Sequence, residues 1–150
     1  MSAFVAFLHH VAAFTLAGAL AIEFVLIRDE LTLRSARRLL IADAVLGAAA
    51  GVVLAAGLLR VFYFEKGAAY YFHSVPFIAK VALFVAIALL SIYPTVTFLS
   101  WRGAVKQGRS PVPEPGKLGR IRALIHFELA LLVVLILCAA LMAKGIGVLS

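Results

Sequence analysis

Histidines and a lysine near the starts of two apolar runs are the first residues of this chain that could do chemistry. His9 and His10 are adjacent near the N-terminus, and His73 precedes an apolar run that carries Lys80. Neutral imidazole is a common axial ligand of haem iron. These residues indicate a haem site, with His9 or His10 as one axial ligand. His73, Lys80 or Met142 would be the second ligand, unless Lys80 neutralises a haem propionate.

A second group of side chains is mostly acidic. Each of its members lies inside an apolar run, a few residues from an arginine: Glu23, Asp43, His126 and Glu128. Carboxylates with a histidine suit a divalent metal ion or a proton relay, and ionisable groups at membrane depth usually face the interior of a bundle. His126 and Glu128 point about 200° apart on a helix, so both face one pocket only if the bundle wraps that helix. The alternative is structural salt bridges with neighbouring arginines.

The elements that position these residues are membrane-spanning helices. The hydrophobic share is 65% and the mean hydropathy is +1.10. Runs of about twenty apolar residues can cross the hydrocarbon core, and they must be helical because backbone groups in lipid bond internally. We expect an all-α, antiparallel bundle of four transmembrane helices in a single domain, residues 1–150. The expected spans are about 3–27, 39–59, 76–100 and 123–143.

The basic residues predict the topology. Four arginines lie in 28–38 and six basic residues in 102–122, whereas 60–75 holds only Arg60 and Lys66. Short loops rich in lysine and arginine stay in the cytoplasm, so both termini and the 60–75 loop are expected on the outer face of the membrane. The net charge of +7 is therefore a topology signal and does not indicate nucleic-acid binding.

Helix contacts within or between chains are indicated by Gly47 and Gly51 in the second run. Small residues four apart let helices approach closely in lipid, which predicts a central place in the bundle or a homodimer. A cofactor-free scaffold subunit that packs through these glycines is a further alternative. The chain has no glycine-rich phosphate loop, zinc-protease helix or nucleophile elbow, so nothing supports a kinase or a hydrolase.

Three segments also carry a family resemblance: LHHVAAFTLAGALAIE (Leu8–Glu23), HSVPFIAKVALFVAIALLSIYPT (His73–Thr95) and IHFELALL (Ile125–Leu132). They resemble an uncharacterised family of small bacterial inner-membrane proteins. That family is similar to the copper-resistance protein D-like membrane proteins and to the small four-helix protoporphyrinogen oxidase that binds haem b.

In the oxidase group a histidine of the first helix and a lysine of the third serve haem binding or activity. The resemblance maps this lysine onto Lys80 and the histidine onto His9 or His10. It implies a haem-linked role and a membrane oxidoreductase. The chain departs from the oxidase group in having Ser-Ile-Tyr-Pro-Thr where that group tends to have a tyrosine-histidine pair.

Overall fold

The computed structural model describes residues 2–64 and 68–147, and the secondary structure of this part is helical. In chain order the elements are α1 (Ser2–Leu26), α2 (Leu33–Leu59), the π-helical turn η1 (Arg60–Phe64), α3 (Ala68–Phe72), α4 (Val75–Ser100), α5 (Arg102–Lys106) and α6 (Lys117–Ala143). Four stretches are long and apolar enough to span a membrane: Ser2–Leu26, Leu33–Tyr63, Val75–Lys106 and Lys117–Ala143. The prediction of an all-α protein with four transmembrane helices is confirmed. Lys66 lies outside the described residues.

Two of the helices begin earlier than the expected spans. α2 begins at Leu33 and α6 at Lys117, each six residues before the predicted start. Hydropathy marks only the part of a helix in hydrocarbon, whereas arginine and lysine are good helix formers that extend it into the interface. At α2 a capping box strengthens this early start: the Thr32 hydroxyl accepts from the Ser35 backbone N–H, and the Ser35 hydroxyl accepts in return from the Thr32 N–H.

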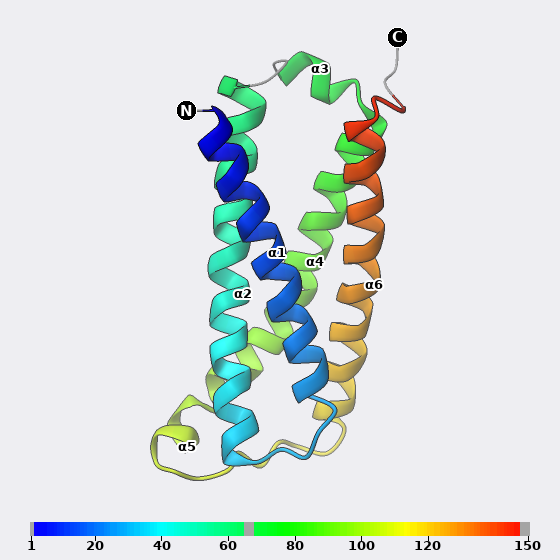
Figure 1. Ribbon diagram of the computed structural model, residues 1–150. Helices are drawn as coiled ribbons and strands as arrows, with labels where there is room; N and C mark the ends of the chain where they lie inside the picture. Colours follow the sequence, from blue (N-terminus) through cyan, green and yellow to red (C-terminus); the bar gives the residue numbers. More distant parts are fainter. Residues whose placement is uncertain (1, 65–67, 148–150) are drawn as a thin grey trace.

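The bundle consists of two helical hairpins. α1 packs mainly on α2, and α4 mainly on α6, while contacts between the hairpins are less extensive. Figure 1 shows the first turn of α1 and the last turn of α6 at the same end of the bundle. We call this end the termini end, and the opposite one, with α5 and the two basic loops, the arginine-rich end. Which end faces the cytoplasm stays a prediction.

Packing is densest toward the arginine-rich end. The largest fully buried apolar side chains there are Leu20, Leu39, Phe98, Ile121 and Ile125. At the termini end a smaller cluster of Val61, Tyr71 and Phe77 packs with Met142. Large apolar side chains such as those of Phe14, Leu89 and Val133 are exposed on the outside of the bundle, as lipid contact requires.

The start of α4 depends on a close backbone contact. Ser74 is its N-cap residue and Pro76 lies in its first turn, as the sequence predicts, but the Ser74 hydroxyl makes no capping hydrogen bond. Instead the backbone N–H of Val75 donates to the carbonyl of Gly147 (3.1 Å). Gly147 has φ +82°, and a Cβ there would lie 2.9 Å from Cδ of Pro76, so the contact needs glycine.

Gly47 and Gly51 do not hold two helices of this chain together. Both are exposed on α2, and a Cβ added to either would meet no atom within 4 Å. We expected these glycines at the centre of the bundle. In the described residues they lie instead on the outward face of α2. A homodimer through this face stays a prediction.

Candidate functional site

Three buried carboxyl groups lie within electrostatic reach of one another between the helices. Glu23 of α1, Asp43 of α2 and Glu128 of α6 have exposed fractions of 1%, 6% and 1%. Asp43 and Glu128 lie ten and eleven residues into their helices, which places both about 15 Å from the helix starts. Asp43 and Glu128 are near enough to Glu23 to act on it electrostatically, and Asp43 acts likewise on Glu128. Side chains distant in sequence thus form one acidic cluster within the membrane-spanning part.

The remaining long helix, α4, supplies hydroxyl groups to this cluster. The Ser91 hydroxyl donates to Oε2 of Glu128 (2.7 Å), and the Thr95 hydroxyl donates to Oδ1 of Asp43 (2.6 Å). Ser91 and Thr95 are one turn apart on α4, so they present their hydroxyls along one side of that helix. We call Glu23, Asp43, Ser91, Thr95 and Glu128 the polar layer. Every long helix contributes to it.

The acidic groups of the polar layer act on one another electrostatically, and among the described residues none of them forms an ion pair with an arginine. Oε1 of Glu23 and Oε1 of Glu128 are buried without a hydrogen-bond partner among the described residues. Two nearby arginines are used elsewhere: Nε of Arg122 donates to the carbonyl of Ile27 (2.8 Å), and the Arg28 guanidinium lies 4.5 Å from the centre of the Phe24 ring. In residues 2–64 and 68–147 the salt bridges considered as an alternative are therefore not formed.

His126 lies apart from the three carboxyl groups. It is exposed on α6, and its ring centre is 5.9 Å from that of Phe24. The wide angle between His126 and Glu128 explains this, because Glu128 points inward and His126 does not. The described residues include no group of three or more histidine, cysteine, aspartate or glutamate side chains placed to hold a metal ion.

At the termini end, His9 is the candidate haem ligand that points into the bundle. It is half-buried, its Nδ1 lies 3.1 Å from the carbonyl oxygen of Val53, and its ring packs on Gly57 of α2. A Cβ at Gly57 would be 3.4 Å from Cε1 of the ring, which is an ordinary van der Waals contact. With Nδ1 held by a carbonyl, Nε2 is the nitrogen left for another partner.

The other candidates at this end point in different directions. His10 and His73 are exposed, and Nδ1 of each lies near the carbonyl four residues earlier, Ala6 (2.6 Å) and Ala69 (2.7 Å). Lys80 is half-buried on α4, with Nζ 3.9 Å from Sδ of Met142. Lys80 still acts electrostatically on His9, so the two share one region.

Sequence reasoning missed Ser91 and Thr95. Their position in the sequence could have indicated this role, because Ser91 and Thr95 flank Pro94 at the same depth as Asp43 and Glu128. A hydroxyl in a transmembrane helix commonly bonds to its own backbone, as Thr97 does to the carbonyl of Tyr93, so residue type alone does not distinguish the two uses.

Comparison with known proteins gives one result. The model of a family described as "Predicted membrane protein (DUF2214)" matches residues 1–147. No curated protein matches the chain, and no solved structure does.

Proposed function

Because the chain belongs to the DUF2214 family of predicted membrane proteins, whose description states no activity, we propose its function from its own geometry. We propose that it is a proton-handling membrane protein in which the polar layer takes up and releases protons inside the bilayer. The observation that carries the proposal is the meeting of three buried carboxyl groups, from three helices, without a basic partner among the described residues.

The cost of charge in a membrane interior supports this reading. An ionised carboxylate there is expensive unless it is paired, and several in one cluster repel each other. Binding a proton removes that cost. Hydroxyls suit such a cluster, because Ser91 and Thr95 can donate to a carboxylate or rotate to accept from a carboxylic acid. The oxygens of Glu23 and Glu128 that lack a partner are positions where a proton can be held.

Proton flux into liposomes tests the proposal. The purified protein is reconstituted with a pH-sensitive dye inside, and a potassium diffusion potential drives proton entry. We expect acidification with the wild type and little with Glu23→Gln, Asp43→Asn or Glu128→Gln. Glu114→Gln is the matched control, since Glu114 is exposed in the 107–116 linker. Equal flux in all variants, or none above empty liposomes, would leave the scaffold alternative. Stoichiometric divalent metal in the purified protein would favour the metal alternative.

The proposal includes an orientation. With the arginine-rich end in the cytoplasm of a bacterial cell, the protein is a multi-pass inner-membrane protein with both termini outside. Single cysteines at Ser110 and Lys144, both exposed, test this in a Cys138→Ala background. A membrane-impermeant thiol reagent added to whole cells should label the Lys144→Cys protein and not the Ser110→Cys protein. The reverse pattern contradicts the orientation.

A haem-linked redox role is the second candidate, and the position of His9 favours it. Ligating histidines commonly hold one ring nitrogen on a backbone carbonyl, as Nδ1 of His9 does on Val53. Bound haem would supply one-electron chemistry, with Nε2 of His9 as a ligand and Lys80 near a propionate. Purification after haem supplementation should give a Soret band that His9→Ala removes and His10→Ala retains. Absence of the band from the wild type would rule this role out.

A further inference from the structure

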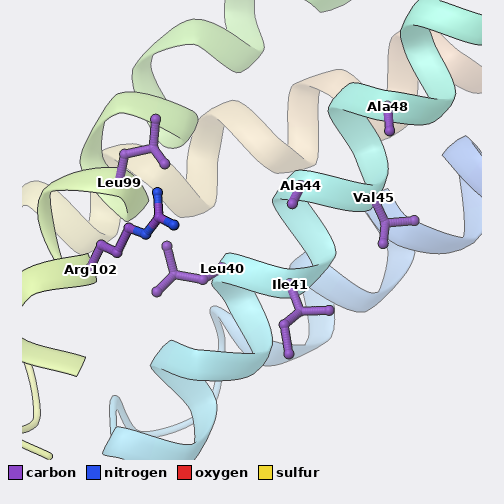
Figure 2. A pocket seen from close by; sticks show the side chains of 7 residues that line it. All are labelled: Leu40, Ile41, Ala44, Val45, Ala48, Leu99 and Arg102. Atoms are coloured by element: carbon purple, nitrogen blue, oxygen red, sulfur yellow. The ribbon is translucent and has the colours of Figure 1, made fainter. Parts of the chain in front are cut away.

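Two apolar grooves run side by side along α2 toward the arginine-rich end. The first lies between α2 and the end of α4, has a volume of about 500 Å³, and is lined by Leu40, Ile41, Ala44, Val45, Ala48, Leu99 and Arg102. Figure 2 shows Leu40 pointing from α2 toward Arg102, whose guanidinium lies beside Leu99. The second, about 480 Å³, lies between α1 and α2 and includes Arg38 at the same end. Ile41 and Val45 line both grooves, so they form a ridge between them.

The charge of these grooves is restricted to one end. Apart from Arg38 and Arg102 their lining is uncharged, and no acidic side chain is part of it. Both arginines are exposed, and among the described residues neither guanidinium has an ion pair or hydrogen bond. From Leu40 to Ala48 the first groove covers about 12 Å of helix axis, which lies within one leaflet. An apolar channel that ends in a cation at the interface matches a lipid with an anionic headgroup.

We propose that this face of α2 binds one anionic diacyl phospholipid. Its acyl chains lie in the two grooves on either side of the Ile41–Val45 ridge, and Arg38 and Arg102 hold its phosphate. Two chains match two grooves, and guanidinium is the cation best suited to a phosphate because it can donate two parallel hydrogen bonds. The site is separate from the polar layer and does not depend on proton handling.

Native mass spectrometry of the detergent-purified protein with added phosphatidylglycerol tests the site. An arginine near a headgroup contributes about 1 kcal/mol, or about fivefold in affinity, so Arg38→Gln with Arg102→Gln should weaken binding of one lipid by about 30-fold. Arg37→Gln is the matched control, because Arg37 is exposed on the same turn and lines neither groove. Ala48→Phe should weaken binding by filling the first groove, and lysophosphatidylglycerol, with one chain, should bind less than the diacyl lipid.

Several outcomes would overturn the proposal. Equal binding of phosphatidylcholine and phosphatidylglycerol would show that the arginines do not select an anionic headgroup. An equal loss in the Arg37 variant would show a general effect of surface charge. A dimer that Gly47→Leu dissociates, with no lipid retained, would show that a second copy of the chain covers this face. Circular dichroism of each variant confirms that the helices are intact.

Discussion

Replacing Glu23 by leucine should make the protein more stable. Glu23 is 1% exposed, its Oε1 has no hydrogen-bond partner among the described residues, and the groups that act on it electrostatically are both acidic. A buried polar atom without a partner costs about 1–3 kcal/mol, and leucine has a similar size without that cost. We expect Glu23→Leu to raise the free energy of unfolding by about 1–3 kcal/mol. Glu23→Gln keeps a polar group and should change it by less than about 1 kcal/mol.

The measurement is an SDS titration in mixed micelles, followed by circular dichroism. Glu114→Leu is the control, since Glu114 is exposed in a linker and its loss should change stability by no more than about 0.5 kcal/mol. A Glu23 in a buried ion pair would behave in the opposite way, because breaking such a pair costs about 3–5 kcal/mol. A loss of 2 kcal/mol or more in Glu23→Leu would refute the reasoning. A Glu23→Leu variant with a higher free energy of unfolding but a lower proton flux into liposomes would identify Glu23 as a functional residue.

Two further predictions concern contacts within the fold. A double-mutant cycle of Ser91→Ala and Glu128→Leu, read by the same titration, should give a coupling of about 0.5–1.5 kcal/mol, since one hydrogen bond of 2.7 Å joins the pair and leucine removes its acceptor; additive effects would contradict that bond. Gly147→Ala should lower the thermal midpoint more than Gly145→Ala, because both glycines have positive φ but only a Cβ at Gly147 meets Pro76; equal shifts would contradict the contact.

Depth along the helices could be predicted from the sequence, but rotation about their axes could not. Hydropathy and the 1.5 Å rise place Glu23, Asp43 and Glu128 at neighbouring levels, and the structure brings the three together. The direction of a side chain around its helix depends on which neighbour that helix packs against. For this reason the sequence predicts that His126 lies with the carboxyl groups, whereas the structure places it exposed beside Phe24.

The same limit applies at the termini end. His9 and Lys80 share a region, as equal depth predicts, but the Nδ1 of His9 is held by α2 whereas Lys80 reaches Met142 of α6. The hairpin pairing, α1 with α2 and α4 with α6, decides these directions. No feature of the individual runs specifies it, because each helix is apolar around most of its circumference and lacks a marked polar face.

The hydrogen bond between Asp43 and Thr95 has a consequence for biogenesis. The two residues are 52 positions apart, in different hairpins, so α1 and α2 leave the ribosome well before α4. During that interval the Thr95 hydroxyl is absent, and an aspartate costs about 2.5–3.5 kcal/mol at the centre of an inserting helix and less toward its end, where Asp43 lies. The leucines and alanines around it must offset this cost unaided. Membrane insertion of the first hairpin therefore depends on its own apolar composition. The Thr95 hydroxyl of the second hairpin can donate to Asp43 only after that hairpin has also inserted.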